Sequence, residues 1–340
     1  MARRILNAAL ILAVALLAAA TLFFVRDYDR VPAGPAGKVL FEIAPGQSVR
    51  TIAGNLRAEG IIRRPWAFLA GYRLFHAGRT LKAGEYEIAL PAAARDVLSK
   101  LLAGKVFLRP ITVPEGLTVA EVDERFRASA FPIKGSFADA AADPGPAASW
   151  DARALDLEGY LFPDTYRFAK DTPASVAAAT MAARFGKAFG GAEARRAAEL
   201  RMTVREVVTM ASLIEKETAV PEERPLISAV FHNRLRIGMK LDCDPTVIFA
   251  LKRDGLWRGR LLLKDLRHPS PYNTYVFPGL PPGPICSPGE GSLQAALSPA
   301  PGEYLYFVAD AEGRHSFSRS YREHLAAVRR YRAKKGPGRP

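Results

Sequence analysis

The chain has 340 residues, which is enough for two or three folded units rather than one. Hydrophobic residues make up 49% of it and charged residues 24%, a globular composition that excludes a largely disordered chain. The formal net charge is +14 at pH 7, a balance that often indicates a nucleic-acid partner unless the location of the chain excludes one.

The amino-terminal segment predicts a membrane helix. Ile5–Val25 is an almost uninterrupted apolar run that is long enough to span a hydrocarbon core. Two arginines precede it and the charges directly after it nearly cancel, so the positive-inside rule predicts a cytoplasmic amino terminus and an extracytoplasmic remainder. A cleaved signal peptide is the alternative, but the length of the run favours a retained anchor. We therefore expect a cytoplasmic stub over residues 1–4, a transmembrane helix over 5–25 and a linker over 26–37.

The chain ends in a basic tail over residues 332–340 and just before them: Arg329, Arg330, Arg332, Lys334, Lys335 and Arg339. An extracytoplasmic location argues against nucleic acid as their partner, and anionic lipid headgroups or an acidic wall polymer fit the charge better. For the tail itself, a solvated and disordered end is the simplest account.

The next segment, residues 38–105, predicts a small α+β module. A strand, two helices, a returning strand and a third helix are expected over Lys38–Ile43, Val49–Glu59, Pro65–Phe75, Leu81–Ile88 and Ala93–Leu102. This order, with the sequence FEIAPGQSVRTIAGNLRAEGII, resembles a LysM module. In that family such modules bind the glycan of peptidoglycan. A purely structural spacer stays open as the alternative.

The middle of the chain predicts a strand over Val106–Val113, a helix over Val119–Phe126 and an alanine-rich helical stretch over Pro173–Leu200, broken near Gly186–Gly191. Between them, Glu158–Tyr166 (EGYLFPDTY) combines aromatic rings with carboxylates in a loop-like setting. Such a combination suits sugar rings, but a packed corner with a purely structural role is the interpretation we favour for this run alone.

The stretch Thr203–Thr218 (TVREVVTMASLIEKET) predicts a helix that opens with a capping box of Thr203 and Glu206. At about 100° per residue, Glu215 falls in line with the apolar side of this helix, whereas Glu217 faces away. Desolvation raises the pKa of a carboxyl group on an apolar face, and a protonated carboxylic acid can then donate its proton near neutral pH. The alternative is a solvated or salt-bridged Glu215 at an ordinary helix end.

Further polar residues follow this helix. The expected helix Pro221–Met239 ends in Asn233 and Arg234, which could hold a substrate carboxylate or amide, or simply a structural carboxylate. Asp244 and Thr246 come next, and Asp244 either caps a helix over Pro245–Leu251 or serves as a second catalytic carboxylate.

Ser270–Gly289 is rich in proline and glycine, which excludes a helix or a central strand, yet it carries Asn273 and Tyr275. A rigid loop of this kind usually serves a functional site. A short helix, a buried strand and a closing helix are expected over Ser292–Leu297, Tyr304–Ala309 and Tyr321–Tyr331.

Two cysteines, Cys243 and Cys286, lack the spacing of a metal site, so neither a metal nor another cofactor is expected. Whether they form a disulfide stays open.

Several spaced motifs now appear in one order: EGYLFPDTY, ASLIEKET, NRLRIGM, DPT, SPYNTY, GLPPGPI, and YLYFVAD followed by HSFS. Together they strongly resemble the MltG/YceG-like family of endolytic murein transglycosylases, over roughly Val39 to Tyr331. The resemblance implies an α+β protein: a transmembrane helix, the LysM-like module over 38–105 and a mixed α+β catalytic domain over 106–331. It also implies a single-pass protein of the inner membrane whose catalytic domain lies in the periplasm.

The same resemblance implies cleavage of the β-1,4 bond after N-acetylmuramic acid in nascent glycan strands, with a 1,6-anhydro product and control of strand length. It assigns the catalytic role to Glu215, the residue that the helical projection also selects. The matching motifs make six residues candidate substrate contacts: Asn233, Arg234, Asp244, Thr246, Asn273 and Tyr275. Peptidoglycan strands are the expected substrate and peptidoglycan synthases are candidate partners. A non-catalytic peptidoglycan-binding scaffold and a two-carboxylate hydrolase, with Asp244 as the second carboxylate, are the alternatives.

Overall fold

The computed structural model describes residues 2–129, 133–309 and 314–335. The chain divides into two compact units. The first, here called unit 1, runs to Arg109 and includes Arg167–Lys170; the second, unit 2, comprises Pro110–Tyr166 and the chain from Asp171 onward. The division falls slightly after the predicted boundary at residue 105, and a short later segment joins the first unit.

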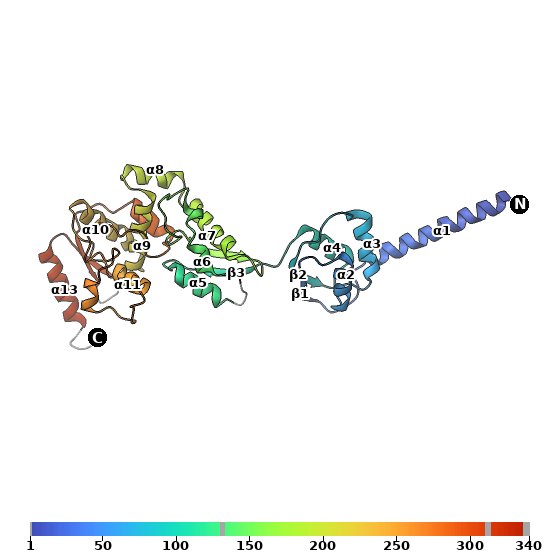
Figure 1. Cartoon of the computed structure of the whole chain (residues 1–340), viewed down its shortest axis with the longest axis horizontal. Coiled ribbons are helices and arrows are strands. Elements are labelled where there is room, and N and C mark those ends of the chain that lie inside the picture. Colours follow the sequence, from blue (N-terminus) through green and yellow to red (C-terminus); the bar gives the residue numbers. More distant parts are fainter. Residues whose placement is uncertain (1, 130–132, 310–313, 336–340) are drawn as a thin grey trace. The chain divides into compact units, whose positions relative to one another are not determined.

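Unit 1 begins with the long helix α1 (Ala2–Asp29), drawn in blue in Figure 1. Its span Arg3–Asp29 has a mean hydropathy of 2.7, and none of its most apolar window is buried within the protein. By length and composition this helix could cross a membrane. An apolar amino-terminal helix is therefore confirmed, and it extends beyond the predicted range at both ends.

The rest of unit 1 has the predicted order of strand, two helices and strand. Strands β1 (Gly37–Ile43) and β2 (Gly84–Leu90) pair antiparallel, and α2 (Val49–Ala58), α3 (Pro65–His76) and α4 (Ala94–Ala103) complete the unit. Ser48 caps α2 by accepting a hydrogen bond from the Thr51 amide, and Gly104 closes α4 at φ +64°. The core consists of fully buried side chains from all of these elements, among them Phe41, Leu56, Phe68, Tyr86 and Leu98.

The predicted linker over residues 26–37 is wrong in its first part, because α1 continues as a helix through Asp29. Tyr28 belongs to the core of unit 1 and is 5% exposed. Its ring lies over Gly71 of α3, where a Cβ atom would be 2.2 Å from the ring. Packing against the folded unit therefore extends the helix past the end of the apolar run.

Unit 2 mixes helices with two-stranded sheets, so the α+β class is confirmed. Its two sheets pair β3 (Arg109–Val113) with β4 (Asp164–Phe168), and β5 (Tyr306–Ala309) with β6 (His315–Ser318). Arg109 of β3 and the last two residues of β4 belong to unit 1. Its helices are α5 (Val119–Arg127), α6 (Phe137–Ala141), α7 (Ala174–Ala188), α8 (Gly191–Glu199), α9 (Val204–Glu217), α10 (Arg224–Arg236), α11 (Asp244–Arg253), α12 (Glu290–Leu297) and α13 (Tyr321–Lys335).

Helix α9 is the central element of unit 2. The capping box of Thr203 and Glu206 is present in both directions, as predicted. Every residue from Val207 to Ile214 is buried, and α8, α10, α11 and α12 all pack against the helix. The sequence predicted one apolar face, but the middle of α9 is buried all round. Its polar Ser212 is accommodated because its hydroxyl accepts a hydrogen bond from the Ile285 amide and donates one to the Thr209 carbonyl.

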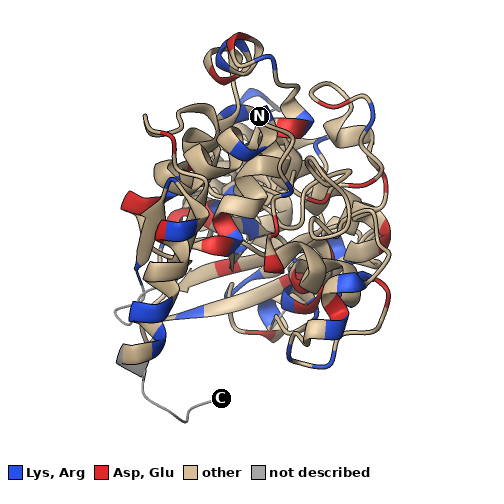
Figure 2. Cartoon of the chain, turned by 90° about the vertical axis from the view of Figure 1, so that its left-hand side faces the viewer, with Lys and Arg blue, Asp and Glu red and all other residues tan. Residues whose placement is uncertain are grey.

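The structure also tests three further expectations for unit 2. Tyr160, Phe162 and Tyr166 of the EGYLFPDTY motif are buried, which confirms the packed corner, although its end forms β4. Strand β5 is half-buried rather than buried, because it belongs to a two-stranded sheet. Helix α13 continues to Lys335, so the prediction of a disordered tail is wrong for residues 332–335; Arg and Lys are good helix formers. Figure 2 shows the basic residues spaced along α13. Residues 336–340 lie outside the described part of the chain.

Candidate active site

Glu215 lies near the end of α9, where its carboxylate meets two other segments of unit 2. Its Oε2 accepts a hydrogen bond from the Gly289 amide at 2.9 Å. Its Oε1 lies 3.5 Å from Nη2 of Arg224, and the side chain is only 7% exposed. The carboxylate is thus held away from bulk solvent by one amide and one guanidinium.

Arg224 joins Glu215 to a second carboxylate, which sequence reasoning did not single out. Nη2 of Arg224, at the start of α10, also lies 3.5 Å from Oε2 of Glu115. Partial burial raises the pKa of Glu115, and the negative charge of Glu215 raises it further, whereas Arg224 lowers it. The only sequence signal for Glu115 was its place in the Pro114–Gly116 turn before α5.

Two loops meet across the end of α9. The Gly116 amide donates to the Ser287 carbonyl, and the Ser287 amide donates to the Leu117 carbonyl, both at 2.8 Å. Gly116 has φ +80°, which glycine adopts without steric cost. These hydrogen bonds therefore fix the end of the Pro/Gly-rich loop beside Glu215.

A cavity of about 730 Å³ opens beside these side chains. Glu115, Glu215, Glu217, Lys216 and Arg224 all line it. With Glu121, which also lines it, four carboxylates and two cations border this open space at the end of the central helix.

Glu217 leaves α9 in a different direction from Glu215, but it is also withdrawn from solvent. Burial raises the pKa of its carboxyl group, a hydrogen bond with the Cys243 thiol lowers it, and the charge of Asp244 raises it. The helical projection placed Glu217 on a different side of α9 from Glu215, and its contact with Cys243 agrees with that; the projection did not predict that this side of the helix is packed as well.

Asn233 and Arg234 lie at the end of α10, where their donors serve backbone carbonyls. Nδ2 of Asn233 donates to two carbonyls before β5. Arg234, 8% exposed, donates to the carbonyls of residues 240, 241 and 305 and lies 3.6 Å from Asp242. These contacts favour the structural alternative for both residues.

Thr246 and Asn273 are fully buried. The Thr246 hydroxyl donates to the Cys243 carbonyl at 2.6 Å. Nδ2 of Asn273 donates to the carbonyls of Leu266 and His268. Both side chains therefore hold the loops on either side of α11 in place.

Asp244 and Tyr275 form a more accessible pair. The Tyr275 hydroxyl donates to Oδ1 of Asp244 at 2.7 Å. Helix α11 begins at Asp244 itself, with Cys243 as its cap, so the interpretation of Asp244 as the capping residue is wrong. Among the residues that the structure describes, neither member of this pair lines the cavity beside Glu215.

Both cysteines are buried and free. Burial raises the pKa of each thiol well above its ordinary value. The Cys286 thiol donates to the Ser212 carbonyl of α9 at 3.4 Å, and Cys243 contacts Glu217. Cys243 and Cys286 are therefore two separate thiols and do not form a disulfide in this structure.

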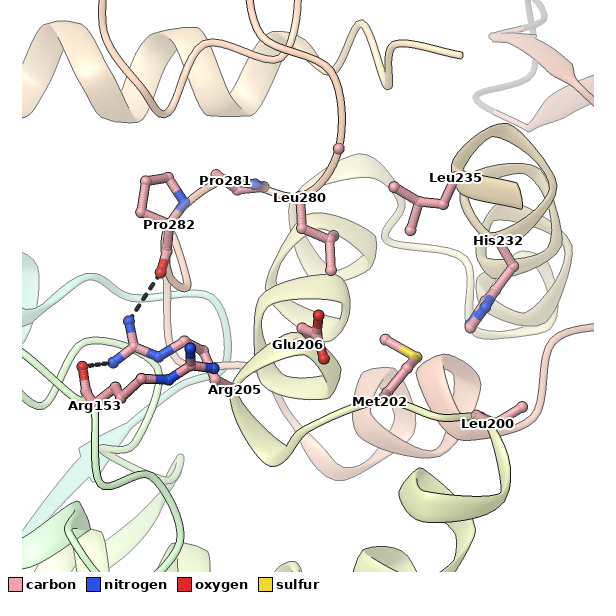
Figure 3. A pocket seen from close by; sticks show the side chains of 11 residues that line it. Arg153, Leu200, Met202, Arg205, Glu206, His232, Leu235, Leu280, Pro281 and Pro282 are labelled. Carbon is pink, nitrogen blue, oxygen red and sulfur yellow. Dashed lines mark hydrogen bonds between the residues drawn. The ribbon is translucent and has the colours of Figure 1, made fainter. Parts of the chain in front are cut away.

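A second cavity, of about 610 Å³, lies at the other end of α9 (Figure 3). Arg205 donates to the carbonyls of Arg153 and Pro282 there, as the dashed lines show. Glu206 accepts from the Thr203 amide in the capping box. Because the polar groups of Arg205 and Glu206 are already engaged, this cavity is a weaker candidate for proton transfer than the one beside Glu215.

A third cavity, of about 630 Å³, contains Glu158 of the EGYLFPDTY motif. Its Oε2 accepts a hydrogen bond from the Val119 amide at 3.1 Å, and burial raises the pKa of its carboxyl group to about 8. Phe249, Trp257 and Glu121 also line this cavity. Glu121 borders the cavity of Glu215 as well, so the two openings adjoin.

The sequence is similar to those of known proteins. The chain is 32% identical over 317 residues to the endolytic murein transglycosylase of Bacillus subtilis, covering 86% of this chain and 84% of that one. It is 29% identical over 313 residues to the endolytic murein transglycosylase of Streptococcus pneumoniae, covering 83% of this chain and 56% of that one.

A solved structure agrees. The crystal structure of a yceG-like protein from Listeria monocytogenes matches with a TM-score of 0.55 and 31% sequence identity, covering 86% of this chain and all of that one. The model of the YceG-like family matches residues 41–330, which include unit 1 from residue 41 onward, most of unit 2 and every residue of the site at the end of α9. A match of that extent, with its curated relatives, shows that the chain belongs to the YceG-like family.

Proposed function

We propose that this protein is an endolytic murein transglycosylase that cuts peptidoglycan glycan strands at the end of α9. The activity agrees with the names of its curated relatives. The observation that carries the proposal is the Glu215 carboxylate, 7% exposed, beside a cavity of about 730 Å³ and held by an amide and a guanidinium.

The chemistry needs one carboxyl group that gives a proton and takes one back. Protonated Glu215 donates its proton to the glycosidic oxygen between N-acetylmuramic acid and N-acetylglucosamine as that bond breaks. Positive charge develops on the sugar, as in other glycosidic cleavages. The Gly289 amide and Arg224 stabilise the carboxylate that remains.

The carboxylate then accepts the proton of the sugar's own 6-hydroxyl group, whose oxygen closes the 1,6-anhydro ring. No water attacks, so no second carboxylate is required. Glu115 borders the same cavity and replaces Asp244 as the residue that a hydrolase would use to activate water.

Glu217 is the second candidate for the acid. It lines the same cavity, and burial raises the pKa of its carboxyl group, which is the property expected of a proton donor at neutral pH. Its contact with the Cys243 thiol on the α11 side argues for a supporting role.

Of the six candidate substrate contacts, Asp244 is exposed, and Tyr275 and Asn233 are partly exposed. The amide group of Asn233 donates to two backbone carbonyls, which leaves Asp244 and Tyr275. We assign contact with the glycan to this pair. Asn233, Arg234, Thr246 and Asn273 act through the loops that they hold, because their hydrogen bonds go to the protein itself.

The proposal places α1 as a single-pass anchor in the inner membrane, with the rest of the chain in the periplasm. The length of α1 and the arginines before its apolar run support this orientation. The strand–helix–helix–strand order of unit 1 supports a LysM-like module, with glycan binding and a spacer role as its two possible uses.

The test compares Glu215→Gln with Glu217→Gln in the full chain, using purified wall glycan and mass analysis of the products. Because general acid catalysis contributes about 10²- to 10⁴-fold, we expect Glu215→Gln to lose at least about a hundredfold in rate while folding normally. Glu217→Gln, the matched control on the same helix, should retain most of the activity.

Each product identifies one reaction. Anhydro ends support a transglycosylase, reducing ends indicate a hydrolase, and no cleavage by the unmodified protein leaves a binding scaffold. If Glu217→Gln abolishes cleavage while Glu215→Gln does not, the acid is Glu217 and our assignment is wrong.

A further inference from the structure

Helix α3 and the end of α1 expose an apolar surface on unit 1, which we call the α3 platform: Trp66, Leu74 and Phe75 of α3 with Phe23 and Phe24 of α1. In α3, Leu74 is 67% exposed, Phe75 60% and Trp66 42%. Solvent-exposed apolar side chains of this size in one place mark an interaction surface. Figure 1 shows α3 next to the point where α1 enters the unit.

The platform lies at the level where the apolar run ends. The ring centroid of Phe24 is 6.4 Å from that of Trp66 and 6.2 Å from that of Phe75, and Tyr28 lies 6.1 Å from Phe75. Phe24 is next to the last residue of Ile5–Val25, a run that matches the thickness of a hydrocarbon core. If α1 crosses a bilayer, Trp66 and Phe75 are therefore at the depth of the membrane–water interface, where aromatic side chains concentrate.

The position of α3 relative to α1 is fixed by packing. The Tyr28 ring fills the space over Gly71 of α3, and it belongs to the core of unit 1. Two ion pairs support the contact: Arg64 with Asp27 at 3.3 Å and Arg95 with Asp29 at 3.2 Å. Unit 1 is thus continuous with the helix and does not hang on a flexible linker.

Basic side chains also lie near the end of α1, where the apolar run stops. A cavity of about 230 Å³ at the end of α1 is lined by Arg26, Arg30 and Arg63, with Asp27 beside them. All three arginines are exposed. Guanidinium groups bind phosphate oxygens in bidentate geometry, and arginines at the end of a membrane helix attract lipid headgroups.

We propose that the α3 platform is seated in the headgroup region of the bilayer that α1 crosses, with Trp66, Leu74 and Phe75 among the upper acyl chains and the arginine cavity on phospholipid phosphates. The partner is a phospholipid surface, because α1 brings that surface to the platform. The proposal is independent of the cleavage reaction and rests only on α1 crossing a membrane.

Depth-dependent quenching tests it. The chain has three tryptophans, so Trp150→Phe with Trp257→Phe leaves Trp66 as the only one in the full-length protein. The protein is reconstituted into phosphatidylcholine–phosphatidylglycerol vesicles that carry bromine near the headgroup end or near the tail end of the acyl chains. We expect the shallow bromines to remove about half of the Trp66 emission and the deep ones clearly less, since interfacial aromatics lie near the carbonyl level.

A matched pair of variants supplies the control. Leu74→Glu places a charge in the platform. Because α3 is packed on α1, the two helices should shift together toward the water, and the shallow bromines should then quench Trp66 less. Leu263→Glu, at a side chain 87% exposed in unit 2, should leave the quenching unchanged. Because both leucines are exposed, neither change threatens the fold.

Two outcomes overturn the proposal. In the first, alkaline extraction fails to remove the protein from the vesicles, and neither brominated lipid changes the emission of Trp66. That result means that α1 is inserted but the platform stays in water. In the second, neither acrylamide in the water nor either brominated lipid quenches the emission of Trp66. That result means that another protein surface covers the platform.

Discussion

Glutamate side chains of unit 2 illustrate how the surroundings of one residue type differ within a single domain. Glu215 is held by an amide and a guanidinium, while Glu115 shares that guanidinium from a more exposed position. For Glu217 and Glu158, burial has the largest effect on the carboxyl group, and it raises the pKa of each. At this scale, hydrogen-bond donors and cations from distant segments decide what a carboxyl group can do.

We predict that Glu158 makes the stability of the protein depend on pH. The folded protein keeps this carboxyl protonated up to about pH 8, whereas the unfolded chain ionises it near the ordinary value of 4.5. Between these values the folded state holds a proton that the unfolded state releases, so the free energy of unfolding falls as pH rises. Glu158→Gln should remove this part of the decline in thermal melts of the full chain in detergent.

The control for that prediction is Glu124→Gln, at an exposed glutamate that lines the same cavity. It should keep the pH dependence of the unmodified protein. Parallel melting curves for Glu158→Gln and the unmodified protein across pH 5–8 would contradict the prediction.

At the scale of elements, the site depends on helix ends. Glu215 lies near the end of α9, Arg224 begins α10, and Gly289 caps α12. A Cβ at Gly289 would lie 1.9 Å from the Glu115 carboxylate, and one at Gly291 would lie 2.4 Å from Nη1 of Arg224. Helix α12 can approach α9 and α10 closely because its first turn carries these glycines.

We therefore predict that Gly291→Ala reduces glycan cleavage more than Gly289→Ala. The first displaces Arg224, which contacts Glu215, and an error of about 1 Å in positioning can cost up to a hundredfold in rate. The second displaces the exposed Glu115 and should cost less than about tenfold, since the Gly289 amide stays in place. The test measures the cleavage rates of both variants on purified wall glycan, and thermal melts show whether each variant folds. Equal losses of rate in the two variants would contradict a role for Arg224 in the mechanism.

We also predict that the start of α9 contributes stability without contributing chemistry. Thr203→Ala removes the hydroxyl that accepts from the Glu206 amide and should cost about 1 kcal/mol in the free energy of unfolding. Thr203→Ser keeps the acceptor and should restore most of that loss. Urea titration of the full chain in detergent measures both, and an unchanged midpoint for Thr203→Ala would show that the cap is dispensable.

At the scale of the whole molecule, the chain consists of a candidate membrane helix joined to one compact unit and a second unit that carries the candidate site. The first unit includes the end of that helix in its own core through Tyr28. A membrane anchor that is packed in this way transmits its orientation to the folded unit beside it.

Gly71→Ala tests that junction. Its Cβ would lie 2.2 Å from the Tyr28 ring, so we expect overpacking to cost about 1–3 kcal/mol in the stability of unit 1. Gly54→Ala in α2 has no atom within 4 Å of the new Cβ and should stabilise the same unit by about 0.5–1 kcal/mol. With Trp150→Phe and Trp257→Phe in the background, the emission of Trp66 during urea unfolding reports on unit 1. A Gly71→Ala protein as stable as Gly54→Ala would show that the junction is loose.

The sequence by itself determined the apolar helix, the α+β class, the family and most helix limits. Those features follow from short-range physics: periodicity, the caps at Ser48 and Thr203, and the glycine at the end of α4. Only the tertiary structure decided the partners of the polar side chains. It placed Glu217 against Cys243, directed the donors of Arg234 to backbone carbonyls and brought Arg224 and Gly289 to Glu215. Gly289 is 74 residues from Glu215 in the chain, and no local pattern encodes a contact between segments that far apart.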